Sequence, residues 1–440
     1  MNPGDFFQLE QTQLNKASNN QITGTPDKNP IVVIGAGIVG VSAALWLQRD
    51  GHKVVLVDKD GPAEGTSHGN GGVLASCAVV PVNSPGLIKS APGMILNPSS
   101  PLFLKWSYLP KMIPWLMRYL SRANKTDAES TARALTNILS DSVEQHQSLA
   151  QGTPADKWLK PSDYLFVYDS REKFEKEAFT WSLRKKMGYK WREMDTAEFE
   201  AYEPAFKGGN NFAIRLTDHG HISDPGKYVK TLARHFENQG GTIEIAEVLD
   251  FDISNNAITA VKTSKGLIKC SKMVLAAGVW SGKLAEKLDF KASMETERGY
   301  HIELVNPSVI LRAPMMLASG KFVITPMEGR IRCAGIVEFG GMDIPSSREP
   351  FELLKKLIHQ AIPGLTYDHI EEWMGHRPAP SDSVPLIGPV KNVAGAYAAF
   401  GHHHIGLTGG PKTGRLIADM IAGRKSNIDL APYRVSRFTH

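Results

Sequence analysis

The chain has 440 residues, with 50 basic and 45 acidic side chains and a formal net charge of +5. Because this near-balanced composition contains no run of like charges, we expect no nucleic-acid partner. The length exceeds that of one compact core, so two domains are expected.

The cysteines and the N-terminal segment indicate in which cellular compartment the protein is expected. Cys77, Cys270 and Cys333 are odd in number and far apart, which fits neither a disulfide framework nor a metal site and favours a reducing, cytoplasmic environment. Residues 1–28 are polar, rich in Asn and Gln, and lack the apolar segment of a signal peptide, so we expect a flexible leader. No uncharged apolar run has the length of a membrane span.

A glycine-rich turn is the first motif along the chain. The β-branched run 31–34 leads into Gly35-Ala-Gly37-Ile-Val-Gly40 and then into an apolar helical pattern. In a dinucleotide-binding turn, the first glycine permits the tight bend, the second lets the backbone approach a pyrophosphate, and the third lets the helix lie close to the strand. The order of strand, glycines and helix therefore predicts a dinucleotide site.

The second strand supports this prediction. Residues 53–57 form an apolar strand that ends in Asp58, about twenty residues beyond the glycines, where a carboxylate accepts hydrogen bonds from both ribose hydroxyls. The carboxylate argues against a 2′-phosphate. The polar, Gly-rich segment 65–73 can present backbone donors to a ligand, and we expect it to continue the cofactor site.

Residues 85–122 mix prolines, aromatic residues and cations and allow two interpretations. The favoured one is a pair of helices packed over the substrate domain, because the prolines interrupt any long helix. The other is an interfacial patch between Trp106 and Arg122 that contacts a membrane surface.

The middle of the chain alternates between helix and strand patterns. A charged helix is expected at 171–187, and Asp224 followed by Pro225 caps a helix that runs to residue 236. A strand at 241–248, alternating segments at 250–258 and 267–270, and a strand at 273–278 are typical of a flavin-type fold more than of a nicotinamide one. The alternation that returns at 290–368 predicts an antiparallel sheet.

Four motifs further along the chain point to a known family. They are Thr66-Ser67-x-x-Asn70-x-Gly72, Arg298-Gly-Tyr300, Gly375-x-Arg377-Pro, and Gly401-His402 followed by Gly406-Leu-Thr408. With the glycine turn, they make the chain from about residue 30 to 423 resemble the D-amino-acid oxidase and dehydrogenase superfamily of FAD enzymes. The bacterial D-amino-acid dehydrogenase branch is the most similar, including enzymes that act on D-proline or D-hydroxyproline.

The resemblance implies an α/β (α+β) fold. A discontinuous Rossmann-type FAD-binding domain is expected beside a substrate domain built on an antiparallel β-sheet. The expected boundaries are 1–28 for the leader, 29–90, 208–289 and 370–425 for the FAD-binding domain, 91–207 and 290–369 for the substrate domain, and 426–440 for a C-terminal tail.

Arg377 and Tyr300 are the expected substrate-binding residues. A planar, permanently charged guanidinium suits a carboxylate, and the resemblance gives this role to Arg377. The alternative is that Arg377 pairs only with Asp382 or a backbone carbonyl. Tyr300 either donates a second hydrogen bond to the substrate carboxylate or is a core residue whose hydroxyl is satisfied by the protein.

Three consecutive histidines, 402–404, invite a metal hypothesis, which we reject because adjacent side chains do not converge on one ion and no carboxylate cluster accompanies them. The resemblance places this loop at the flavin ring, with the N–H groups of Gly406, Leu407 and Thr408 at a helix start that stabilises reduced flavin. His402 and His404 are expected either to touch substrate or to be structural. Because Asn70 rather than His68 occupies the polar position of the family, and no cysteine lies at 401–414, we expect noncovalent FAD.

The cofactor contacts implied by the resemblance come from the glycine turn, the end of the second strand, the loop 65–73, the strand ends near 248 and 277, and the last helix. They are Gly35, Gly37, Ile38, Val39, Gly40, Asp58, Lys59, Thr66, Ser67, Asn70, Gly71, Gly72, Val73, Val248, Ala277, Gly278, Trp280, Gly401, Gly406, Leu407 and Thr408.

The implied activity is oxidation of a D-amino acid or a cyclic secondary amino acid by hydride transfer from Cα to flavin N5, giving an imine and then a 2-oxo acid. Arg377, Tyr300, His402 and His404 are the expected catalytic residues. Electrons would pass to a quinone or a carrier protein, with peripheral contact at the inner face of the cell membrane. A sarcosine-type N-methyl amino acid dehydrogenase or oxidase, and an FAD-binding subunit of an electron-transfer complex, stay open as alternatives, and the sequence does not separate oxidase from dehydrogenase.

Overall fold

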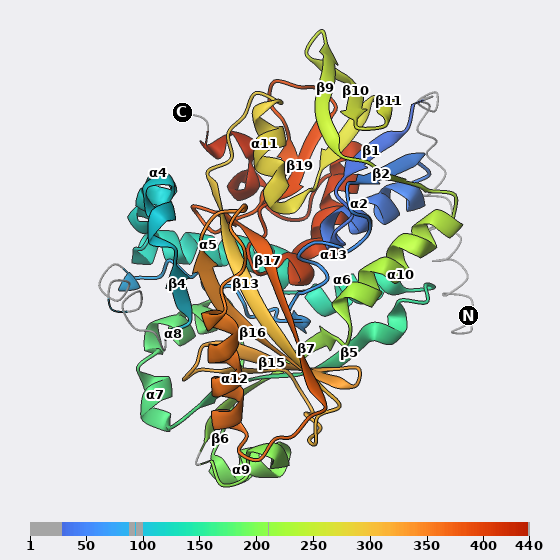
Figure 1. Ribbon diagram of the computed structural model, residues 1–440. Helices are drawn as coiled ribbons and strands as arrows, with labels where there is room; N and C mark the ends of the chain where they lie inside the picture. The colour runs from blue at the N-terminus through green and yellow to red at the C-terminus, as the bar shows by residue number, and fades with distance from the viewer. Residues whose placement is uncertain (1–28, 88–92, 94–99, 210, 439–440) are drawn as a thin grey trace, which may run out of the picture.

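The computed structural model describes residues 29–87, 93, 100–209 and 211–438. Two large sheets lie in opposite halves of the molecule, and a small three-stranded sheet extends from one of them (Figure 1). The predicted leader, 1–28, and part of the segment 85–122 lie outside the described residues.

The six-stranded sheet has the order β18-β19-β12-β1-β2-β8 and is parallel except for β18. All four residues of β1 are buried, because parallel partners flank it on both sides and helices cover the sheet. The strands are β1 Ile31–Ile34, β2 Val54–Asp58, β8 Thr242–Ile245, β12 Lys272–Leu275, β18 Leu386–Pro389 and β19 Ala396–Phe400.

Two helices pack closely together against this sheet, α2 Ile38–Arg49 and α13 Gly406–Ile421. A Cβ atom at Gly414 would lie 2.6 Å from the backbone nitrogen of Ala43, so only glycine allows this approach. Helix α10, Pro225–Asn238, also packs on α2 and begins at the predicted cap, where the Asp224 carboxylate accepts a hydrogen bond from the Lys227 amide.

The predicted meander is present as a three-stranded antiparallel sheet of β9 Val248–Ser254, β10 Ala257–Thr263 and β11 Gly266–Lys269.

The ten-stranded sheet follows the order β17-β13-β16-β15-β14-β5-β7-β3, with β4 beside β16 and β6 beside β7. Most pairs are antiparallel, as predicted, whereas β14–β5 and β16–β4 are parallel. Helix α12, Glu349–Ala361, packs on β13 and β16. The strands are β3 Val73–Leu74, β4 Leu102–Leu104, β5 Leu159–Tyr168, β6 Arg192–Met194, β7 Phe212–Ile222, β13 Met294–Val305, β14 Met315–Leu317, β15 Phe322–Met327, β16 Arg330–Phe339 and β17 His369–Pro380.

Three strands lie in a different sheet from the one that the expected domain boundaries imply. Strands β3, β7 and β17 belong to the ten-stranded sheet, although the ranges 29–90, 208–289 and 370–425 assigned them to the FAD-binding domain. Helices α5, Lys125–Leu139, and α6, Ser142–Ala150, both pack on α13, and α6 also packs on β5 and β7 of the ten-stranded sheet. Sheet membership depends on pairing between distant segments, which local patterns do not reveal.

The remaining helices are short. The helix expected at 171–187 is divided in two, and the segment 85–122 contains one described helix, α4, with Pro114 inside it. These helices are α4 Leu109–Ser121, α7 Arg171–Glu175, α8 Ala178–Lys186, α9 Thr196–Tyr202 and α11 Ser281–Glu286, with 3₁₀ turns at Trp106–Tyr108, Asp156–Trp158, Pro204–Phe206, Gly278–Trp280, Ala431–Tyr433 and Val435–Phe438.

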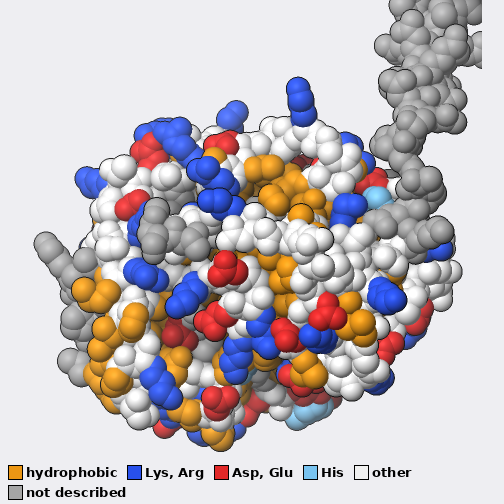
Figure 2. All heavy atoms as spheres, turned by 90° about the horizontal axis from the view of Figure 1, so that it is seen from above, with side chains coloured by type: hydrophobic (Ala, Val, Ile, Leu, Met, Phe, Trp, Pro, Cys, Tyr) orange, Lys and Arg blue, Asp and Glu red, His pale blue; other side chains and the backbone are white. Residues whose placement is uncertain are grey.

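Basic and acidic side chains are interspersed on the face drawn in Figure 2, with small groups of apolar side chains between them. Within the described part of the chain, none of the helices combines the length and the apolar composition needed to cross a bilayer.

Candidate functional site

A cavity of about 1180 Å³ runs between the two large sheets. One end is lined by the turns after β1, β2 and β12, and the other end by the face of the ten-stranded sheet and by α4. Of the predicted cofactor and catalytic residues, all but Gly40 and Gly72 line this cavity. The structure therefore brings together residues from positions 35 to 408.

The glycine turn forms the first end of the cavity. Gly35 has a φ of 102°, and a Cβ atom there would lie 2.5 Å from the Ala276 carbonyl oxygen, so this position requires glycine. A Cβ atom at Gly40 would lie 1.8 Å from the Gly35 carbonyl oxygen, which explains its packing role away from the cavity. The Ser67 hydroxyl accepts a hydrogen bond of 2.9 Å from the Ile38 amide at the start of α2.

Asp58 ties the end of β2 to this turn. Its carboxylate accepts hydrogen bonds from the Ala36 amide at 2.7 Å and from the Asp60 and Gly61 amides at 2.9 and 3.0 Å, while still lining the cavity. The ammonium of Lys59 lies 4.7 Å from the centre of the Trp280 ring, which lines the same end. A backbone cradle without side chains beside an ordered carboxylate fits a dinucleotide whose ribose binds Asp58.

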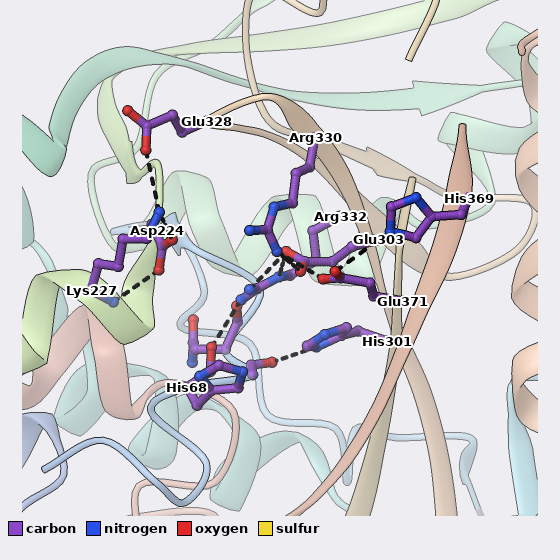
Figure 3. Close-up of polar contacts among 12 residues, drawn as sticks. His68, Asp224, Lys227, His301, Glu303, Glu328, Arg330, Arg332, His369 and Glu371 are labelled. Carbon is purple, nitrogen blue, oxygen red and sulfur yellow. Dashed lines mark hydrogen bonds and ion pairs between the residues drawn. The ribbon is translucent and has the colours of Figure 1, made fainter. Parts of the chain in front are cut away.

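Loop 65–73 is held against the ten-stranded sheet by a buried arginine (Figure 3). The Arg332 guanidinium donates hydrogen bonds to the carbonyls of His68 and Asn70 and forms an ion pair with Glu303 at 2.9 Å. Gly72, with a φ of 79°, donates its amide to the Asn70 side chain at 2.9 Å, so its role is to form the turn. The loop is therefore fixed by the protein itself.

Two stacked aromatic rings, those of His301 and Trp373, support the same loop. His301 donates a hydrogen bond of 3.0 Å to the Gly69 carbonyl, and its ring stacks on Trp373 with the centroids 5.1 Å apart. A Cβ atom at Gly69 or at Gly375 would lie 2.0 Å from the Trp373 ring. His68 points toward Gly226, outside the cavity lining. Trp373 was not predicted from the sequence. The signal that could have identified it is the pair of glycines that make room for its ring, Gly375 two residues later and Gly69 in the facing loop.

The start of helix α13 faces the cavity. Among the described residues, the amides of Gly406, Leu407 and Thr408 donate to no acceptor, and all three residues line the cavity. His146 donates a hydrogen bond of 2.9 Å to the Leu407 carbonyl, and the Ser142 hydroxyl donates one of 2.8 Å to the Thr408 carbonyl. Burial lowers the pKa of His146 to about 4, so this anchor is neutral. These contacts present three free N–H groups at the positive end of a helix.

Arg377 projects from β17 into the other end of the cavity. Its guanidinium lies over Gly299, where a Cβ atom would come within 2.5 Å of the Arg377 Cζ atom. Within the described chain it donates no hydrogen bond, and Asp382, one of its predicted alternative partners, binds Arg437 at 2.7 Å. Burial lowers the pKa of Arg377, and Glu297, directly opposite on β13, counteracts this. The planar donor set is therefore open to a ligand.

Tyr300 takes the second of its two predicted arrangements. Its hydroxyl donates to Glu338 at 2.6 Å and accepts from the Ser347 amide at 3.0 Å, and burial raises its pKa to about 12. The predicted hydrogen bond to a substrate carboxylate is not supported, because the hydroxyl is already satisfied in the core. Tyr300 therefore contributes to the wall of the cavity, and its hydroxyl is bonded inside the protein.

The three consecutive histidines have three different environments. His402 hydrogen-bonds Thr413 at 2.9 Å, and burial lowers its pKa to about 3. His403 Nε2 lies 2.7 Å from the Glu297 carboxylate, and His404 is exposed to the cavity. Sequence reasoning missed Glu297 and His403. No local pattern identified Glu297, because its place opposite Arg377 depends on the pairing of β13 with β17.

The rest of the cavity wall is apolar and aromatic. Helix α4 contributes Met112, Trp115, Leu116 and Tyr119, and the ten-stranded sheet contributes Tyr164, Phe166, Met316 and Phe339. The opposite side of α4, with the turn before it, exposes Trp106, Ile113 and Met117. The predicted membrane contact at this segment stays a prediction.

Comparison with known proteins places these features in context. The family profile DAO, described as FAD dependent oxidoreductase, matches residues 30–420. A D-amino-acid oxidase of Bradyrhizobium diazoefficiens is 35% identical over 94% of this chain and 100% of that protein. A D-amino acid dehydrogenase of Helicobacter pylori is 28% identical over 89% of this chain and 95% of that protein. The glycine oxidase structure from Geobacillus kaustophilus has a TM-score of 0.72 at 19% identity, covering 93% of this chain and 99% of that one.

Proposed function

Because this chain belongs to the DAO family of FAD-dependent oxidoreductases, we propose that it is an amino-acid dehydrogenase that oxidises the Cα–N bond of a D-amino acid or a cyclic secondary amino acid. The predicted family, fold class and FAD cofactor are confirmed by the family match and by the likeness in fold. Noncovalent attachment of FAD stays a prediction.

The observation that carries this proposal is the open guanidinium of Arg377. Arg377 is half-buried in the wall of the cavity, and its N–H groups donate to no acceptor of the described chain. A carboxylate fits a planar fork of donors and forms charge-assisted hydrogen bonds with it. Arg377 would therefore hold the substrate by its carboxylate at the sheet side of the cavity.

The residues at the other side fit the cofactor. The cradle of Gly35 and Gly37, the Asp58 carboxylate and the loop 65–73 would hold FAD, with the amides of 406–408 at its ring. When bound, FAD supplies the hydride acceptor. The free amides at the α13 start would stabilise the negative charge that accumulates there.

The lining of the remaining wall favours a substrate with an apolar or cyclic side chain. Aromatic residues from α4 and the sheet give this wall a large apolar area, with the Arg184 guanidinium 4.7 Å from the centre of the Phe166 ring. The preference for D-amino acids is supported by the names of two relatives over nearly the full chain. We propose a quinone or a carrier protein as the electron acceptor, reached from the exposed side of α4.

The test is anaerobic titration of the purified FAD-bound protein with D-, L- and N-methyl amino acids, including proline and hydroxyproline isomers. We expect loss of the flavin absorbance with D- or cyclic substrates and a 2-oxo acid or cyclic imine as product. Formaldehyde as product would instead identify a sarcosine-type enzyme. A flavin that no amino acid reduces would contradict the proposal.

A further inference from the structure

Three ionisable side chains connect the cavity wall to the buried strand β13. Oε1 of Glu297 lies 2.7 Å from Nε2 of His403, and both side chains are more than nine-tenths buried. Nδ1 of His403 contacts Nδ1 of His404. His404 is exposed to the cavity that also contains Arg377. The series therefore begins at the substrate space and ends inside the protein.

The hydrogen bonds fix which nitrogen carries each proton. A carboxylate only accepts, so His403 donates its Nε2–H to Glu297. In a neutral His403 ring the Nδ1 atom then has a lone pair, and His404 must donate its own Nδ1–H to it. The neutral arrangement consequently leaves Nε2 of His404 as an unprotonated acceptor.

The backbone at His403 has a conformation that is unfavourable for a residue other than glycine. His403 has a φ of 51°, in the left-handed region that a residue with a Cβ atom rarely adopts. Its amide donates a hydrogen bond of 2.8 Å to the Pro378 carbonyl, next to Arg377 on β17. This turn brings the adjacent rings of His403 and His404 together, with their centroids 4.6 Å apart.

The charges around the series favour movement of a proton away from Arg377. Desolvation inside the cavity lowers the pKa of His404 well below its ordinary value, and His403 and Arg377 lower it further. Burial raises the pKa of Glu297, but His403 and Arg377 outweigh this and keep the carboxylate ionised. A positive charge is therefore unfavourable at His404, whereas the Glu297 carboxylate provides a negative charge 2.7 Å from His403.

Other ionisable groups near the series are neutral or engaged elsewhere. Tyr119 on α4 has a pKa raised well above its ordinary value by burial and by Glu297. Burial also raises the pKa of Glu295 on β13, whose carboxylate accepts the Tyr108 hydroxyl at 2.9 Å. His402 in the same loop is bound to Thr413.

We propose that Glu297, His403 and His404 form a proton relay that accepts the ammonium proton of the bound amino acid, an inference that rests on the proposed function. The amine must lose this proton before oxidation, because the nitrogen lone pair forms the C=N bond as the Cα–H electron pair departs. Nε2 of His404 takes the proton as the N–H bond of the ammonium breaks, and the Nδ1 proton of His404 passes to Nδ1 of His403. His404 ends neutral with its proton on Nε2, and His403 becomes an imidazolium paired with the Glu297 carboxylate.

The test compares the pH dependence of anaerobic flavin reduction in the FAD-bound protein and its variants. Glu297→Gln and His404→Gln should slow reduction about 100-fold at pH 6, the size typical of a lost acid–base group. The rates should approach that of the unchanged protein near the ordinary pKa of the substrate amine, where free amine is available. The matched control is Glu295→Gln, the same change two residues away on β13, and it should keep the original profile.

A second readout does not depend on turnover. Nitrogen NMR of protein labelled in histidine should show His404 neutral with the proton on Nδ1, and Glu297→Gln should change the shifts of His403. His404 faces the cavity, so His404→Gln should fold and bind FAD even if a change at Glu297 does not.

The outcomes separate the relay from the proposed function. If D-amino acids reduce the flavin but both variants keep the original pH profile, or His404 carries its proton on Nε2 when neutral, the relay is wrong and the function stands. If no amino acid reduces the flavin of the unchanged protein, the proposed function fails, and the relay fails with it.

Discussion

Two arginines on adjacent strands differ in how the protein uses their donors, and one is fully buried while the other is half-buried at the cavity. Arg298 on β13 is fully buried and donates five hydrogen bonds, to Glu338 and to the carbonyls of Gly340, Gly341, Ile344 and Pro345. Arg377 on β17 donates none within the described chain. A guanidinium whose donors are filled by the protein stabilises the fold, whereas one left open inside a cavity is available to a ligand.

Replacement of Arg298 should have the largest effect on stability. Arg298→Met removes the cation paired with the buried Glu338 and leaves several carbonyls without a donor, so we expect the free energy of unfolding to fall by about 3–5 kcal/mol. Glu338 keeps the hydrogen bonds from the Tyr300 and Ser347 hydroxyls. Unfolding in urea, followed by tryptophan fluorescence, measures it. Arg348→Met, which removes exposed ion pairs with Glu352 and Glu372, is the control and should change stability by less than about 1 kcal/mol. Equal losses in both variants would remove the distinction between the two arginines.

Replacement of Arg377 should affect substrate capture and not folding. Arg377→Met should keep the flavin spectrum and the unfolding midpoint while kcat/KM falls by a factor equivalent to about 3 kcal/mol, as expected for a lost charge-assisted pair. Steady-state kinetics with the substrate that bleaches the flavin gives this value. Unchanged kinetics would show that another group binds the carboxylate.

The comparison between paired and unpaired polar groups also applies to an acid, the buried Glu203. Oε1 of Glu203 accepts the Arg312 amide at 2.7 Å, but Oε2 has no partner in the described structure, and burial raises its pKa to about 7. The folded protein holds this proton up to a higher pH than the unfolded chain does, so stability falls as the pH rises from about 4.5 to about 7.

The expected loss from Glu203 over that window is on the order of 2–3 kcal/mol. Glu203→Gln should remove this component and make the protein more stable than the unchanged one at pH 8. Unfolding midpoints measured between pH 4.5 and 8 compare the two proteins. Parallel pH profiles would mean that Glu203 does not titrate as described.

Filling the space between Gly299 and the Arg377 guanidinium should have the smallest effect. Gly299→Ala places a Cβ atom where the guanidinium lies, so the fork must shift, and we expect kcat/KM to fall about tenfold, or about 1.4 kcal/mol. In the Arg377→Met background the same change should have little further effect, because the group that it displaces is gone. Additive losses in the double variant would contradict this explanation.

The sequence predicted the parts of the fold that depend on local patterns. The turn at Gly35, the strand ending in Asp58 and the cap at Asp224 are formed as expected, because neighbouring residues determine them. The family resemblance pointed to Arg377, and the structure adds that it donates no hydrogen bond to the described residues. Its open state depends on where Asp382 points, which no local pattern reveals.

The features that were missed depend on pairing between distant strands. Glu297 meets Arg377 because β13 and β17 pair in one register, and Tyr300 reaches Glu338 because β16 lies on the other side of β13. The same long-range pairing places β7 and β17 in the ten-stranded sheet. A single sequence contains no direct signal for such register.

Binding of a carboxylate that the enzyme does not oxidise tests the central role of Arg377 most directly. The FAD-bound protein and its Arg377→Met variant would be titrated with propionate and, separately, with propionamide, while the flavin difference spectrum is recorded. We expect saturable binding of propionate to the unchanged protein only, and no binding of propionamide to either protein. Equal propionate binding by the two proteins would contradict the assignment of Arg377 as the carboxylate-binding residue.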